Sequence, residues 1–367
     1  MVSIFRRKVS QTSEPTFKER VQNFWQWYAE RAATFHGNLK QKQHSIIQPQ
    51  ISAKVDELLP SAAWVFGDGP NGNGHSFTLT GEGNLHLQFL TEYWRKQAPS
   101  LEGWTFYSSR QPSNDLESWQ IKIEGETFNP LEFWLAPNLD QEREKIDITA
   151  WHPLFAKLPE KNRWTVLFLV LDEALGEFGT QTWIGEINVS DRRLADALPL
   201  KELPAFVGRT EDETGWKKYA PTDTWTGYQM NEPHSRFRRG DIITGTTVNP
   251  ILLREFLQSD DKLEDPLFNT GADFVFVQFP SEILPGGKQI EKRAQIENAL
   301  EAALASDAAG QLIGGALGTQ FAYIDLLLLD GANSLDIVQK VLRECTLPKG
   351  TSIEFYAHSR RDRRIVV

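Results

Sequence analysis

Three acidic side chains stand at the end of an apolar segment, where they could perform acid–base chemistry. Asp172, Glu173 and Glu177 follow the apolar run 164–171. A carboxyl group held in apolar surroundings has a raised pKa and can act as a general base. With His152 as a partner, such a base would fit a hydrolase. The alternative is structural: the carboxylates bond to backbone N–H groups or lie at a solvated helix end. The sequence shows no second catalytic partner, which favours this alternative.

A second group of candidate residues combines aromatic rings with cations in the segment 206–240. It consists of Trp216, Tyr219, Trp225, Tyr228, Arg236, Arg238 and Arg239. Trp, Tyr and Arg are the residue types enriched at the energetic centres of protein interfaces, so the segment predicts a partner-binding surface. Two other interpretations remain open. The rings could anchor an irregular segment to its neighbours, or they could stack on the bases of a single-stranded nucleic acid.

The remaining motifs indicate neither a metal nor a cofactor. The seven histidines include no pair four residues apart on an expected helix, and one cysteine excludes a Cys-x-x-Cys site. The glycine-rich run 314–319 lacks the lysine of a phosphate-binding loop and precedes a strand, which indicates either a hairpin or a close approach of strands. Ser76 lies in an incomplete G-x-S-x-G pattern that lacks the final glycine.

Composition and charge narrow the class of protein. The chain has 367 residues, of which 40% are hydrophobic and 24% charged, which is typical of a folded globular protein. Its net charge of −10 argues against general nucleic-acid binding. No run approaches the about 20 apolar residues of a membrane span. Cys345 is the single cysteine, so no intramolecular disulfide can form. We expect a cytoplasmic protein with no membrane partner.

The elements that position the acidic residues form an expected N-terminal α+β domain over residues 16–190, preceded by a flexible tail over 1–15. Thr16 and Glu19 have the spacing of a helix capping box, and apolar residues then recur every three or four positions up to Phe35. The segment 164–178 is apolar on nearly all sides, which predicts a buried central helix that ends at the acidic group.

The candidate partner-binding residues fall in a proline-rich segment over 191–266, where only 251–258 has a helical pattern. We expect an irregular bridge between two domains. After it, residues 267–358 alternate as β-α-β-β-α-β, the ferredoxin-like split βαβ arrangement, with both helices on one face. Asp325, in an otherwise apolar strand, is expected to face water on the open side of that sheet. A basic tail with four arginines over 359–367 ends the chain.

Three short stretches resemble known proteins: 24–31, 171–186 and 323–326. They are similar to a group of uncharacterised bacterial proteins that carry a domain of unknown function. The C-terminal pattern is similar, in fold pattern only, to the regulator of ribonuclease activity B family. The resemblance implies a bacterial cytoplasmic protein and no particular activity.

Together these observations predict an α+β protein with two domains and an aromatic-rich bridge. The leading hypothesis is a non-enzymatic binding or regulatory protein that acts through protein–protein contacts. The alternatives are a hydrolase that uses a carboxylate at the end of the buried helix, and an RNA-binding regulator that uses the ferredoxin-like sheet. The sheet lacks the aromatic pattern of an RNA-recognition motif, so a nucleic-acid partner is disfavoured. The sequence indicates neither the partner's identity nor the oligomeric state.

Overall fold

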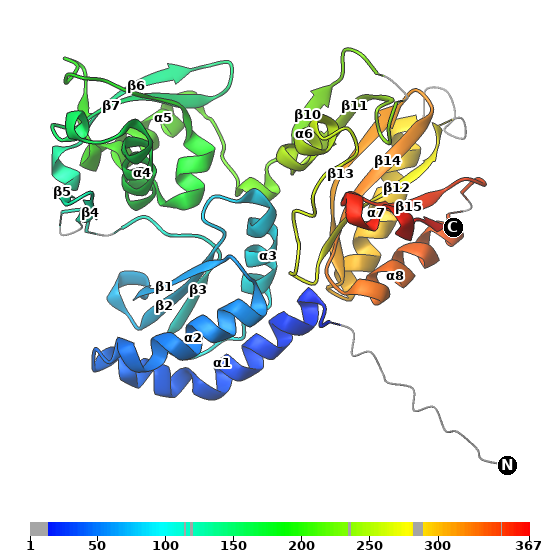
Figure 1. Ribbon diagram of the computed structural model, residues 1–367, viewed down its shortest axis with the longest axis horizontal. Helices are drawn as coiled ribbons and strands as arrows, with labels where there is room; N and C mark the ends of the chain where they lie inside the picture. Colours follow the sequence, from blue (N-terminus) through cyan, green and yellow to red (C-terminus); the bar gives the residue numbers. More distant parts are fainter. Residues whose placement is uncertain (1–13, 114, 118–119, 234–235, 282–288, 346) are drawn as a thin grey trace.

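A computed structural model describes residues 14–113, 115–117, 120–233, 236–281, 289–345 and 347–367. It confirms the α+β class, with helices and sheets arranged as three lobes (Figure 1). Residues 1–13, most of the expected flexible tail, lie outside the described part. Within that part, no helix is both long and apolar enough to cross a membrane.

The N-terminal lobe begins with the expected capped helix. Thr16 accepts a hydrogen bond from the Glu19 backbone, and the Glu19 side chain accepts one from the Thr16 backbone, which closes the capping box. The lobe comprises α1 (Phe17–Lys40), α2 (His44–Leu58), β1 (Ala63–Asp68), β2 (His75–Thr80), α3 (Leu85–Lys96) and β3 (Trp104–Tyr107). Its three strands form one sheet in the order β1-β2-β3. The buried face of α1 packs on that sheet through stacked aromatic rings such as Phe24 and Phe77.

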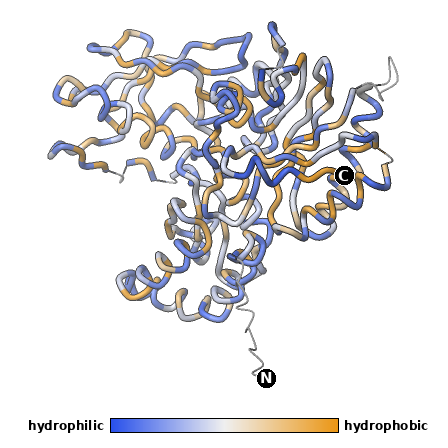
Figure 2. The backbone as a smooth tube through the Cα atoms, turned by 45° about the vertical axis from the view of Figure 1, so that its right-hand side comes forward, coloured by the Kyte–Doolittle hydropathy of each residue, from blue (hydrophilic) through white to orange (hydrophobic). Residues whose placement is uncertain are grey.

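The C-terminal lobe contains the expected β-α-β-β-α-β unit. Its elements are β12 (Asp273–Pro280), α7 (Gln289–Ser306), β13 (Gly310–Gly318), β14 (Phe321–Leu328), α8 (Gly331–Glu344) and β15 (Ser352–Phe355). The four strands lie in the order β13-β14-β12-β15, all antiparallel, which is the ferredoxin-like order. The sheet is larger than predicted because β10 (Thr226–Gln229) and β11 (Ile242–Thr247) extend one edge and β16 (Ile365–Val366) the other. Figure 2 shows hydrophobic stretches along these strands near the C-terminus.

Both faces of the ferredoxin-like part of this seven-stranded sheet are packed against other elements. One face carries Val277 and Ile324, which pack against the apolar residues of α7 and α8. The other face carries Phe274 and Tyr356, which join the core of the N-terminal lobe. The helices α3 and α6 (Pro250–Gln258) lie against this second face. The strands β12 and β14 are mostly buried, whereas Ile243, Thr244 and Thr246 of β11 are exposed. The RNA-binding alternative therefore stays a prediction.

The middle lobe has its own core. It contains β4 (Ile121–Ile123), β5 (Glu126–Phe128), β6 (Trp134–Asp140), β7 (Lys145–Trp151), α4 (Glu160–Trp183), β8 (Ile184–Val189), β9 (Leu198–Pro199) and α5 (Leu203–Thr214). Its main sheet has the order β8-β7-β6-β9. The predicted central helix is confirmed as α4, with Leu167 and Leu171 fully buried. Phe168, however, is half-exposed, so α4 is not covered on all sides.

The prediction of an irregular bridge over 191–266 is wrong. This segment contains β9, α5, β10, β11 and α6. Its apolar residues divide between two cores, with Leu203 and Val207 in the middle lobe and Leu252 and Phe256 in the core shared by the outer lobes. Such short elements, separated by prolines, contain too few turns to show a clear hydrophobic period in the sequence. They are stabilised mainly by the burial of their apolar residues in these cores. The expected division at residues 190 and 266 therefore does not follow the cores.

Residues 358–367 are folded, contrary to the expected basic tail. A 3₁₀ turn over His358–Arg363 precedes β16. Arg360 pairs with Asp265 and Asp273, while Arg364 pairs with Glu354. These two arginines thus have buried or partly buried acidic partners, and those of Arg360 lie far away in the sequence.

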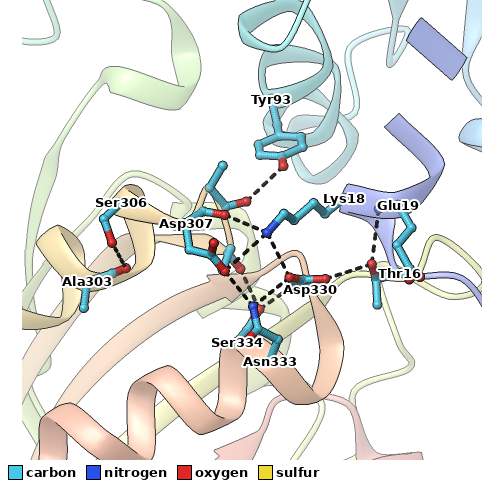
Figure 3. A network of polar contacts seen from close by, with 12 residues as sticks. Thr16, Lys18, Glu19, Tyr93, Ala303, Ser306, Asp307, Asp330, Asn333 and Ser334 are labelled. Atoms are coloured by element: carbon cyan, nitrogen blue, oxygen red, sulfur yellow. Dashed lines mark hydrogen bonds and ion pairs between the residues drawn. The ribbon is translucent and has the colours of Figure 1, made fainter. Parts of the chain in front are cut away.

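A polar cluster joins the first helix to the C-terminal lobe (Figure 3). Lys18 Nζ donates to the backbone oxygen of Asp307 at 2.8 Å and to Asp330 Oδ2 at 3.0 Å. Asn333 Nδ2 bridges the same two carboxylates at 2.6 and 2.8 Å. Tyr93 Oη donates to the carbonyl of Ala308 at 2.9 Å. These bonds fix the N-terminal lobe against the end of α7 and the start of α8.

Candidate functional site

A glycine interrupts α4 at the acidic group. Gly176 has φ = 74°, and a Cβ there would lie 2.9 Å from Pro112 and 3.0 Å from the carbonyl oxygen of Arg110. Because Gly176 has no side chain, residues 110–113, which follow β3, pack directly against the backbone of α4 at this interruption. They are held by bonds from Ser113 N to the Glu173 carbonyl at 2.7 Å and from Glu177 N to the Arg110 carbonyl at 3.0 Å.

Glu177 is a structural carboxylate between two lobes. It is 2% exposed and accepts hydrogen bonds from Thr80 Oγ1, Gly83 N, Gln88 Nε2 and Arg110 N. Four donors satisfy both oxygens, and two of these donors are backbone N–H groups. This geometry agrees with the structural interpretation of the acidic group and not with a general base.

Asp172, in contrast, faces a groove. Residues Thr165, Phe168, Leu169 and Asp172 share one face of α4 because they are three or four positions apart. They line a cavity of about 520 Å³ together with residues of β8, Glu82 and Arg110. Burial raises the pKa of Asp172 to about 6, although the neighbouring hydroxyl of Thr180 opposes the shift. Burial also raises the pKa of Glu173, which does not line the groove.

His152 lies elsewhere in the middle lobe. Its ring is enclosed by Phe128, Phe133 and Phe155, with ring centroids 4.9, 4.3 and 5.7 Å away. Its Nδ1 accepts a bond from Leu154 N at 3.1 Å. His152 does not line the groove of Asp172, so the structure does not bring together the carboxylate and histidine that the hydrolase alternative required.

We expect His152 to remain neutral down to about pH 5. Burial lowers its pKa to about 4, so the folded protein resists a proton that the unfolded chain accepts near its ordinary pKa of 6.5. This difference reduces stability as the pH falls from 6.5 towards 4. The check is an NMR titration in which the His152 Cε1–H resonance stays unchanged between pH 8 and pH 5.5. A midpoint near 6.5 would contradict the enclosed position.

The aromatic and basic candidates separate into buried and exposed members. Trp216 is 7% exposed and packs in the middle lobe, 6.4 Å from the ring of Trp183. Arg238 pairs with Asp261 and Glu354. Three further members differ in exposure: Arg239 is fully buried, Tyr228 partly buried and Arg236 exposed. Tyr219 and Trp225 are 60% and 51% exposed, so these two rings are accessible to a partner.

Tyr219 lines a second cavity, of about 430 Å³, between the middle and C-terminal lobes. Four cationic side chains and one acidic side chain surround it: Arg143, Lys145, Lys217, Lys218 and Glu144. Lys218 Nζ lies 5.3 Å from the ring centroids of both Trp183 and Trp216 and bonds to the Glu144 carbonyl at 2.6 Å. Burial, together with the charges of Lys218 and Arg143, lowers the pKa of Lys145 to about 8. Positive charge is therefore crowded here.

Sequence analysis missed Arg143 and Lys145 because they lie on the preceding hairpin, far from the aromatic segment. Lys145 Nζ donates to the carbonyls of Gln181 and Thr182 at 2.8 and 2.7 Å. These bonds give hydrogen-bond donors to carbonyl groups that have no partner within the last turn of α4. The alternation of β7 could have shown that Lys145 starts a half-buried strand. It could not have shown which helix end that strand approaches.

Asp325 is buried, contrary to the expected water-facing position. Arg239 forms a two-point ion pair with it through Nη1 to Oδ1 and Nη2 to Oδ2. The glycine-rich strand β13 makes room, since a Cβ at Gly314 would lie 3.0 Å from Asp325 Oδ2 and 2.8 Å from the Thr246 carbonyl. This is the close strand approach, one of the two interpretations of the glycine run.

The comparisons with known proteins identify no relative. No family model, curated protein or solved structure matches the chain. The resemblances given by the short stretches therefore stay predictions.

Proposed function

We propose that the protein is a non-enzymatic binding or regulatory protein of the bacterial cytoplasm that holds an acidic segment of a partner protein. The observation that carries this proposal is the exposed ring of Tyr219 in the cavity lined by Arg143, Lys145, Lys217 and Lys218. The exposed ring of Trp225 does not line the cavity but stands between two residues that do, Thr224 and Thr226. The single cysteine fits a reducing compartment.

Charge and ring type both favour such a partner. The whole chain carries a net charge of −10, yet four cations and one anion line this cavity. Arg143 is paired with Asp140 and Asp147, so the lysines supply the positive charge that attracts acidic groups. Among the described residues, the exposed Lys217 has no hydrogen-bond or ion-pair partner, which leaves its ammonium free for a carboxylate. Exposed Tyr and Trp rings supply large contact areas with little loss of side-chain entropy. An acidic peptide with apolar side chains uses all of these features.

Trp225→Ala is expected to weaken binding of such a peptide by about 2 kcal/mol or more. The ring is exposed, so the free energy of unfolding should change by no more than about 0.5 kcal/mol. The measurement is fluorescence anisotropy of a labelled peptide in which glutamates alternate with leucine and phenylalanine. Tyr219→Ala should act in the same direction, and binding should weaken as salt is added.

Two matched controls keep this test specific. Phe268→Ala removes an exposed ring outside the cavity, and Lys122→Glu reverses an exposed charge outside it. Neither should change binding, whereas Lys217→Glu should weaken it. If a peptide with lysine in place of glutamate binds equally well, or if both ring truncations leave the affinity unchanged, the proposal fails.

A further inference from the structure

We propose that the groove between α4, β8 and Arg110 binds an organic cation, a primary ammonium group on an apolar body. This groove is distinct from the cavity of Tyr219, and the inference does not depend on the proposed function. It rests on three features of the groove: an apolar wall, a carboxylate without a cationic partner, and a buried hydroxyl next to that carboxylate.

The apolar wall suits the body of the ligand. Phe168 is 50% exposed, and it lines the groove together with Leu169, Ile184 and Ile187. The cavity volume of about 520 Å³ lies within the range of small-molecule sites, roughly 300–1,000 Å³. An apolar chain or ring of modest size would cover Phe168 and remove it from water.

The charges around the groove favour a cation. Three carboxylates line it, those of Glu82, Asp172 and Glu177, against one guanidinium. Arg110 is already bonded to Glu82 Oε1 through Nε at 3.0 Å and Nη2 at 2.6 Å. Glu177 is satisfied by its four donors. Asp172 makes no ion pair within the described part of the chain, so an ammonium group could pair with it.

Thr180 adds a second polar atom to the groove, next to Asp172. It is 6% exposed, lines the same groove, and its hydroxyl oxygen has no hydrogen-bond partner of good geometry in the described structure. Buried hydroxyls are normally well bonded, and this one has only the nearby Asp172 carboxylate, so a ligand could complete its hydrogen bonding. An ammonium group carries three donors and can bond to the Asp172 carboxylate and the Thr180 oxygen together.

The test is an NMR titration of the full chain with phenethylamine. The matched probe is 3-phenylpropionate, which has the same ring and a similar length but the opposite charge. Phenethylamine should produce saturable shifts at the amides of Thr180 and Gly185, and 3-phenylpropionate should not. Asp172→Asn keeps the shape of the side chain and should weaken amine binding by about tenfold or more. Glu173→Gln removes a carboxylate from the same turn of α4, outside the groove, and should leave binding within about twofold.

Two further arms complete the experiment. Phe168→Ala should also weaken amine binding. Because the ring is half-exposed, its removal should leave the protein folded, so weaker binding would reflect the lost contact. N-acetyl-lysine methylamide presents the ammonium group as a protein side chain would. Binding tighter than that of phenethylamine would assign the groove to a lysine of a partner, and weaker binding would assign it to a free amine. Absence of saturable amine binding, equal binding of 3-phenylpropionate, or unchanged affinity in Asp172→Asn would overturn the inference.

Discussion

Replacing Arg239 by alanine is expected to lower the free energy of unfolding by about 3–5 kcal/mol. The substitution leaves the carboxylate of Asp325 buried without a cation. A single buried charge is far less stable than a buried pair, because the desolvation of the remaining ion is no longer offset.

Aromatic rings surround the cation of this pair. The guanidinium of Arg239 lies 5.0 Å from the ring of Phe276, 4.8 Å from Tyr323 and 5.2 Å from Tyr356. These rings stabilise the cation as well as exclude solvent. Burial alone would lower the pKa of Arg239, but the charge and hydrogen bonds of Asp325, together with Tyr356 and Tyr228, outweigh it and hold the pKa above its ordinary value.

The measurement is urea unfolding followed by circular dichroism, with two comparisons. Arg254→Ala removes an exposed arginine on α6 and should change stability by no more than about 0.5 kcal/mol. The double variant Arg239→Met with Asp325→Leu replaces both charges by apolar groups and should lose clearly less stability than Arg239→Ala. If the single and double variants were equally destabilised, packing and not the unpaired charge would dominate.

The same ion pair shows what the sequence could predict and what it could not. The apolar run 321–329 correctly predicted the strand β14, because such a run is a local property of the sequence. The position of Asp325 was predicted wrongly, since its partner lies 86 residues earlier in the chain. An isolated acid in an apolar strand indicates exposure only when no cation is brought across the sheet. The folded arginines of residues 358–367 illustrate the same limit.

The candidate sites show a similar division. Trp216 and Trp225 have comparable neighbours in the sequence, yet the first is enclosed beside Trp183 and the second is exposed. Only the packing of α4 and the following segment distinguishes them. The acidic group at the end of α4 was located correctly from its apolar run, but its members differ in role. Gly176 turns the chain so that Glu177 points into the lobe interface while Asp172 lines the groove.

Glu177→Ala is expected to be the most damaging substitution in that acidic group, with a loss of about 3 kcal/mol. It leaves the Thr80 hydroxyl, the Gly83 and Arg110 amides and one Gln88 proton without their acceptor. Each unsatisfied buried donor destabilises by about 1–3 kcal/mol, and partial entry of water reduces the sum.

Glu177→Gln separates the acceptor role from the charge. The remaining amide oxygen can still accept from Gly83 and Gln88, and the new NH₂ group can donate to Thr80 Oγ1, but it also faces the N–H donor of Arg110. We therefore expect a loss near about 1 kcal/mol, clearly smaller than that of the alanine variant. Glu186→Ala, an exposed acid on β8, is the control and should change stability by no more than about 0.5 kcal/mol.

The location of the effect is as informative as its size. Glu177 joins the loop before α3 and the chain after β3 to the central helix of the middle lobe, so its loss should loosen that junction first. Hydrogen exchange should accelerate at the amides of Gly83 and Arg110 in Glu177→Ala, while amides in β12 and β14 retain their protection. Uniform acceleration across all three lobes would instead mean that Glu177 supports the whole fold and not one interface. Unchanged exchange at Gly83 would mean that the carboxylate does not hold the junction.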